Sequence, residues 1–191
     1  MLEKLVLASR SYRRFDEHRA IPLAELEALV ALARICPSAG NRQPLRFALS
    51  VDPADNARIF ACLKWAGYLT DWDGPKEGER PAGYIVILNT APEWGFATYD
   101  IGIMAQTMML GAVEKGLGGC MIGAFDRTRL AAVLGLEAGL EIALVLALGK
   151  PVEEVRIVDV AEDGSIKYYR DAAGVHYVPK QRLETLIVRR G

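Results

Sequence analysis

The stretch TYDIGIMAQTMMLGAVEKGLGGCMIGAF, residues 98–125, decides the fold of this chain. No charged side chain stands between Asp100 and Glu114, so the helix predicted here must be buried by its own domain or by a partner. Its uncharged residues, 101–113, are too few to cross a bilayer, which takes about 20. The glycines at 116–119 predict the end of the helix, and residues 120–125 read as a short buried strand. Backbone at Gly123 can approach a ligand closely, so we expect a binding site at this strand end.

Length and hydropathy bound the architecture. A chain of 191 residues is long enough for a real core, and we expect a single domain spanning 1–191. A hydrophobic fraction of 51% and a mean hydropathy of +0.13 are high for a monomer. Together with the uncharged helix, these values favour a homodimer with a sizeable interface.

Charge and cysteine usage exclude several function classes. The net charge of −1 favours neither nucleic acid nor an anionic membrane as a partner. Cys36, Cys62 and Cys120 match neither a disulfide framework nor a zinc site. The apolar run near the N-terminus is too short for the core of a signal peptide, so we expect a cytoplasmic protein.

Periodicity along the rest of the chain mixes helices with strands. Helices are predicted over 2–9, 22–35, 53–63 and 126–135, and strands over 46–51, 83–89 and 140–148. Residues 64–81 hold two tryptophans, glycines, prolines and charges, which is typical of a surface loop or an active-site lid. Trp65 and Trp72 either line a pocket or pack this loop. The order predicts an α+β fold with a sheet of four or five strands.

Two polar segments are candidates for binding. Arg10-Ser11-Tyr12-Arg13-Arg14-Phe15 is either a solvated turn or an anion site, since guanidinium groups match phosphate oxygens bidentately. The segment 37–44, PSAGNRQP, is either an ordinary connection or a loop that reads a heterocycle edge through the amides of Asn41 and Gln43. Cys120 suggests a nucleophile with a histidine base, but a cysteine in a buried strand is far more often a small hydrophobe.

Four blocks taken together resemble the nitroreductase family of FMN-dependent oxidoreductases. The first two are the Arg10–Phe15 hexapeptide, similar to the family's Arg-Ser-x-Arg-x-Phe, and the 37–44 loop, similar to Pro-Ser-x-x-Asn-x-Gln-Pro. The others are the central helix from Asp100 with its Gly-Leu-Gly turn, and Lys180-Gln181-Arg182-Leu183, similar to Lys-x-Arg-Leu. The likeness runs through nearly the whole chain in the right order.

The resemblance implies a mostly antiparallel sheet packed around the long central helix, and a homodimer with a C-terminal arm on the partner subunit. It implies two identical FMN sites at the interface. Arg10, Ser11 and Arg13 would hold the phosphate and ribityl end, with Lys180 and Arg182 arriving from the tail. The flavin contacts would be Ser38, Asn41 and Gln43, with Ser38 and Asn41 reaching over from the partner, and the backbone of Ile122, Gly123 and Ala124.

The activity implied is ping-pong hydride transfer from NAD(P)H to flavin N5, then to an electron-poor acceptor such as a nitroaromatic or a quinone. The cofactor carries this chemistry, so no catalytic side chain is required. Three alternatives stay open: a flavin storage or sensor dimer whose flavin face is blocked by residues 64–81, a specialised branch that dehalogenates, fragments flavin or oxidises azolines, and a flavin-free hydrolase dependent on Cys120.

Overall fold

The computed structural model describes residues 1–189 and 191. Its central sheet has five strands, and every pairing between them is antiparallel. The strands are β1 (Phe15–Asp16), β2 (Leu45–Ser50), β3 (Gly83–Asn89), β4 (Gly118–Ile122) and β5 (Glu141–Pro151). The strand order is β1-β5-β3-β2, and β4 also pairs with β5. The prediction of an α+β fold with four or five mostly antiparallel strands is confirmed.

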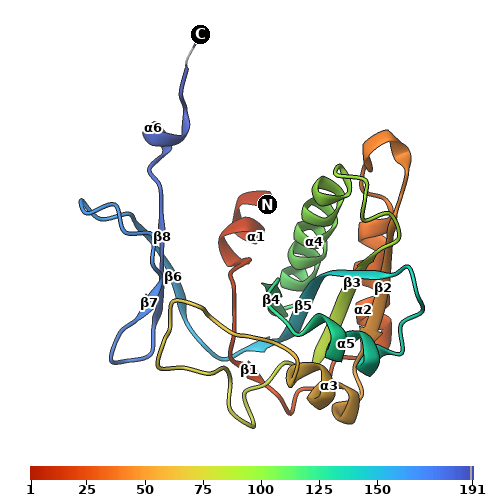
Figure 1. The fold of residues 1–191 in the computed structure, drawn as a ribbon. Helices are drawn as coiled ribbons and strands as arrows, with labels where there is room; N and C mark the ends of the chain where they lie inside the picture. The colour runs from red at the N-terminus through yellow and green to blue at the C-terminus, as the bar shows by residue number, and fades with distance from the viewer. Residues whose placement is uncertain (190) are drawn as a thin grey trace.

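Helices cover both faces of this sheet (Figure 1). They are α1 (Leu2–Ala8), α2 (Leu23–Arg34), α3 (Pro53–Phe60), α4 (Ala97–Glu114) and α5 (Arg127–Leu134). Successive side chains of a strand point to opposite faces, so β3 supplies two cores. Ile85 and Ile87 pack in the cluster that holds the buried residues of α2 and α4. Tyr84 and Val86 pack in the second cluster, with residues of α3 and α5.

The central helix is buried by its own domain along one face only. Toward α2 it packs so closely that a Cβ at Gly111 would lie 2.5 Å from Leu32 Cδ1. On the opposite face Tyr99 is 64% exposed and Ile103 40% exposed. An uncharged helix with such a face needs a further cover, so the partner subunit stays a prediction.

Several predicted boundaries are wrong by one to three residues, including the end of β5, which lies at Pro151 rather than at 148. The strand expected over 120–125 is β4, Gly118–Ile122, because Gly118 and Gly119 already pair with Gly149 and Leu148. A Cβ on Gly119 would lie 2.5 Å from the carbonyl oxygen of Ala147, so the pairing requires glycine there. The helices expected over 53–63 and 22–35 end earlier, at Phe60 and Arg34. The end of α4 is as predicted, with Gly116 in the left-handed region at φ 71°.

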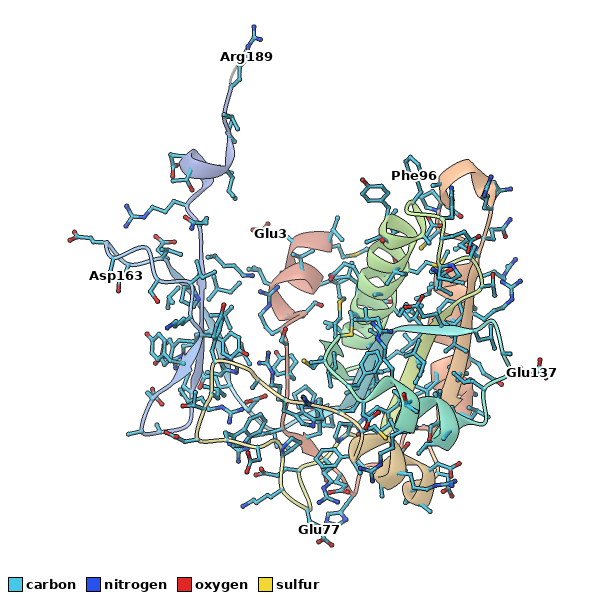
Figure 2. The ribbon with its side chains drawn as sticks, viewed as in Figure 1. Glu3, Glu77, Phe96, Glu137, Asp163 and Arg189 are labelled. Atoms are coloured by element: carbon cyan, nitrogen blue, oxygen red, sulfur yellow. The ribbon has the colours of Figure 1, made fainter. Side chains whose placement is uncertain are left out.

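A second sheet, which the periodicity did not predict, follows the central one. It contains β6 (Val155–Asp159), β7 (Tyr169–Arg170) and β8 (His176–Lys180), with β8 between the other two. Figure 1 shows it standing beside the central sheet, with the short α6 (Leu183–Leu186) and the C-terminus extending away from the body. Figure 2 places Arg189 at the far end of this extension. No helix within residues 1–189 combines the length and the apolar character that crossing a membrane requires.

Candidate functional site

A small cavity lies where β4 ends. Its volume is about 160 Å³, and its lining comes from Arg13, from Lys64, Trp65, Ala66 and Gly67, and from Cys120, Met121, Ile122, Gly123 and Ala124. Backbone hydrogen bonds hold these three segments together. The Tyr12 amide donates to the Gly119 carbonyl at 2.9 Å, and the Lys64 amide donates to the Ala124 carbonyl at 2.9 Å. The cavity therefore joins the arginine-rich hexapeptide, the irregular 64–81 segment and the glycine-bounded strand end.

The residues that follow β4 offer backbone amides as hydrogen-bond donors at a position without a side chain. A Cβ built on Gly123 meets no heavy atom within 4 Å, so a side chain there would project into open space. Gly123 and Ala124 both line the cavity, and within the described part of the chain their amides donate to no other backbone group. A flat polar ligand could approach this backbone closely and accept hydrogen bonds from it.

Arg13 brings a buried positive charge to the same cavity. The residue is 9% exposed, and its Nη1 donates to the Ser11 carbonyl at 3.3 Å. Among the described residues no carboxylate lies within ion-pair distance of this guanidinium. The neighbouring Arg14 differs, because its Nε and Nη2 donate to Glu79 at 3.0 and 2.5 Å. That contact also lowers the pKa of the Glu79 carboxyl. A buried cation without a counter-charge is costly, and an anionic ligand would offset the cost.

Arg10 and Ser11 lie next to the cavity along β4. Ser11 forms a parallel bridge with Gly119, and the Nη2 of Arg10 donates to the Val6 carbonyl at 2.5 Å. The Nε of Arg10 is buried and has no hydrogen-bond partner among the described residues. The structure thus brings six of the predicted site residues to one region: Arg10, Ser11, Arg13, Ile122, Gly123 and Ala124.

Cys120 in the cavity wall is not an activated nucleophile. Burial raises the pKa of its thiol above the ordinary value, an effect that the nearby Arg13 only partly opposes. A thiol with a raised pKa stays protonated at neutral pH, and the thiolate is the reactive form. Its position in β4, 4% exposed, supports the interpretation as a small buried hydrophobe.

Ser38, Asn41 and Gln43 lie elsewhere, at the start of α4. The Ser38 hydroxyl donates to Asp100 Oδ2 at 2.5 Å, and the Ala39 amide donates to Asp100 Oδ1 at 2.9 Å. Asp100 is fully buried, so it anchors the loop to the helix. Asn41 and Gln43 have φ values of 50° and 49°, a strained conformation that clusters at ligand sites. Figure 2 shows the labelled Phe96, just before α4, at the end of the helix away from β4.

This loop takes no part in the cavity within one protomer. None of Ser38, Asn41 and Gln43 lines the cavity that holds Arg13. Lys180 and Arg182 lie at the end of β8, where Arg182 pairs loosely with Asp159 at 3.7 Å. The predicted residues therefore form three groups in the protomer.

Comparison with known proteins decides the family. The profile of the Nitroreductase family matches residues 6–150. The chain belongs to the nitroreductase family. It is 24% identical over 185 residues to the oxygen-insensitive NADPH nitroreductase of Helicobacter acinonychis, covering 80% of this chain and 88% of that relative.

Solved nitroreductase-family structures share the fold. The chain superposes on a family protein from Streptococcus pneumoniae with a TM-score of 0.71 at 14% identity, covering all of both chains. An FMN-dependent nitroreductase from Clostridium difficile gives a TM-score of 0.62 at 19% identity, covering 78% of this chain and 87% of that one. The resemblance drawn from the sequence blocks is thus confirmed at the level of family and fold.

Several residues that line the cavity escaped the sequence analysis. Lys64, Ala66 and Gly67 line the cavity although they carry no family motif. Trp65 is 9% exposed and lines the cavity as well, whereas Trp72 packs under Arg170, whose guanidinium lies 4.4 Å from its ring centroid. The available signal was composition alone: an irregular segment with two tryptophans is expected near a site, but it does not show which residues face inward.

Proposed function

We propose that this chain is an FMN-dependent oxidoreductase that moves hydride from NAD(P)H to an electron-poor small-molecule acceptor. The observation that carries the proposal is Arg13, a buried cation without a carboxylate partner among the described residues, which faces the same cavity as the free amides of Gly123 and Ala124. Two relatives, named as an NADPH nitroreductase and an FMN-dependent nitroreductase, support the same donor and cofactor.

The residues present fit FMN chemically. A phosphate carries close to two negative charges, and Arg10 and Arg13 offer cationic forks beside the cavity. Gly123 leaves room for a flat ring to reach the backbone, and the amides of Gly123 and Ala124 would donate to the ring's acceptor edge. Trp65 would exclude water from one side of the bound ring. When bound, FMN supplies the hydride chemistry between nicotinamide and acceptor.

A homodimer would complete the site. The cavity of about 160 Å³ in one protomer is smaller than the ligand pockets of about 300–1,000 Å³ that proteins use. Ser38, Asn41 and Gln43 are held away from it, so they would serve the cavity of the partner subunit. We include Lys180 and Arg182 as further phosphate contacts in the dimer, and treat residues 1–191 as one FMN-binding domain.

Exposed apolar side chains support an interface of this kind. On α1, Leu2 is 65% and Leu7 55% exposed, and on α6, Leu183 is 62% and Leu186 63% exposed. Together with the exposed face of α4, these leucines supply apolar surface that a partner subunit would bury. The C-terminal arm that carries α6 extends away from its own body, and we propose that it lies on the partner subunit (Figure 1).

Absorbance spectroscopy of the purified protein tests the proposal. A flavin spectrum after reconstitution with FMN, followed by its loss on anaerobic addition of NADH or NADPH, is the expected result. Protein that takes up no FMN under any condition would refute the cofactor, and a monomer in solution that binds FMN fully would refute the shared site.

Substitution of Gly123 by side chains of increasing size tests whether the flavin binds against this residue. Gly123→Ala and Gly123→Leu add side chains into open space, so both variants should melt within a few degrees of the wild-type apoprotein. FMN affinity should fall slightly for alanine and by more than tenfold for leucine, because leucine fills the cavity. Unchanged FMN affinity in Gly123→Leu would show that the flavin does not bind against Gly123.

A second candidate function is a flavin-binding dimer without turnover. Trp65 and its neighbours 64–67 lie against the strand end, which is where a blocking segment would lie. Such a protein would show a flavin spectrum that neither NADH nor NADPH bleaches, although dithionite would bleach it.

A further inference from the structure

Tyr168 touches the cavity's cation from a part of the chain outside the family match, which ends at residue 150. The Arg13 guanidinium carbon lies 4.8 Å from the centroid of the Tyr168 ring. A guanidinium over an aromatic face within about 6 Å is attracted by the ring's electron density. The guanidinium also donates to the Ser11 carbonyl at 3.3 Å, and it lies near the Cys120 thiol, but it forms no ion pair with a carboxylate of the described residues.

We propose that Tyr168 is a positioning residue, which holds the Arg13 guanidinium in the cavity wall so that it meets the anionic groups of the ligand. This inference rests on the proposed function, since the ligand it serves is FMN. It assigns a role in the site to the segment between β6 and β8.

The Tyr168 ring is itself held on several sides. It packs against the Tyr68 ring at 5.0 Å between centroids, and its hydroxyl oxygen accepts from the Tyr68 amide at 3.4 Å. Its other neighbour is His176, 5.3 Å away between centroids and fully buried. A ring held by the 64–81 segment and by β8 is a rigid support for the flexible side chain of Arg13.

His176 suits this position because it is uncharged. Burial, together with the charges of Arg13 and Arg170, lowers the pKa of its imidazole to about 4. The ring is therefore neutral near pH 7 and adds no repulsion to Arg13. It takes part in the packing without competing for the anion.

Glu153 explains why Arg13 depends on an aromatic ring rather than on a carboxylate. The Glu153 side chain is fully buried and accepts from Arg170 Nη2 at 2.9 Å. It also accepts from the backbone amides of Arg13 and Arg14. Its charge is thus engaged by Arg170 and by the backbone, which fixes the main chain at Arg13 and leaves the guanidinium free for a ligand.

FMN binding to the dimer, followed by quenching of flavin fluorescence, tests the role of Tyr168. Tyr168→Leu removes the ring and should weaken FMN binding about 2- to 30-fold, the range of a cation–π contact from exposed to desolvated. Tyr168→Phe keeps the ring and Tyr168→Trp strengthens it, so both should bind within about twofold of wild type. Tyr169→Leu is the matched control, because Tyr169 is 49% exposed and stacks on Tyr177 instead.

A double-mutant cycle separates positioning from general damage. In an Arg13→Gln background, Tyr168→Leu should cost no further affinity, since the group it positions is absent. Equal losses from Tyr168→Leu with and without Arg13, or equal losses in Tyr168→Phe and Tyr168→Leu, would overturn the proposal. Wild-type protein that binds no FMN would refute the proposed function as well, whereas normal binding by Tyr168→Leu would refute the positioning role alone.

Discussion

Replacing Arg13 is the most informative change to this protein. Arg13→Gln keeps a polar side chain of moderate length and removes the one buried guanidinium that lines the cavity. Hydrogen bonds to charged groups contribute about 1.5–3 kcal/mol each. The loss of one such contact should raise the Kd for FMN about 10- to 150-fold.

The neighbouring arginine provides the control for this prediction. Arg14→Gln removes the same charge one residue away, but Arg14 is already engaged by Glu79, so the Kd for FMN should change less than threefold. Both variants are titrated with FMN as purified full-length protein, with melting of the apoproteins as the check on folding. Equal losses in the two variants would show that overall positive charge, and not the free guanidinium, binds the ligand. A change below threefold in Arg13→Gln would refute the phosphate or ribityl contact altogether.

Three further predictions follow from the anchored loop, the tail and the buried histidine. Asp100→Ala strands the Ser38 hydroxyl and should lower the free energy of unfolding by about 1–3 kcal/mol in urea titrations, while FMN binding also weakens. Asp55→Ala, which removes an exposed carboxylate, is its control and should change stability by less than about 1 kcal/mol. Arg182→Ala should weaken FMN retention, because within its own protomer Arg182 forms only a loose ion pair with Asp159 at 3.7 Å and is available to the phosphate. Unchanged retention would show that Arg182 does not contact the phosphate. For His176, the folded-state pKa of about 4 lies below the ordinary 6.5, so the unfolded chain binds more protons between these values. Stability should therefore be complete above pH 6.5 and fall on acidification toward pH 4, by up to about 1.4 kcal/mol per pH unit. His176→Phe should flatten that slope, and an equal slope in the variant would assign it to other groups.

Local patterns predicted most of the strands that build the central sheet, although the two-residue β1 was not predicted. The continuous apolar run of β3 was predicted with the bounds observed, because a strand buried on both faces needs apolar side chains at every position. The uncharged helix and its end at the glycines were likewise predicted, since both depend on neighbours within a few residues. The strands of the second sheet were not, because they are short and half-exposed and their pattern is not distinct from that of loops.

The candidate site also has features that the sequence predicted and features that only the structure shows. Sequence blocks named Arg13, Gly123 and Ala124, and the fold brings these three to one cavity. Their roles, and those of the other predicted flavin contacts, stay predictions. The homodimer and the compartment also stay predictions from sequence.

By itself, the sequence determined the family, the α+β class and the residue types available for binding an anion and a flat ring. These depend on motifs and on short-range periodicity, which a linear chain records directly. Only the tertiary structure decided that Arg13 forms no ion pair with a carboxylate of the described residues, that its guanidinium lies over the Tyr168 ring, and that residues 64–67 line the cavity. Each of these facts is a contact between segments far apart in the chain, and such contacts depend on how layers pack rather than on any local pattern. The exposed face of α4 was likewise not predictable from the sequence, because the burial of a helix face depends on what packs against it.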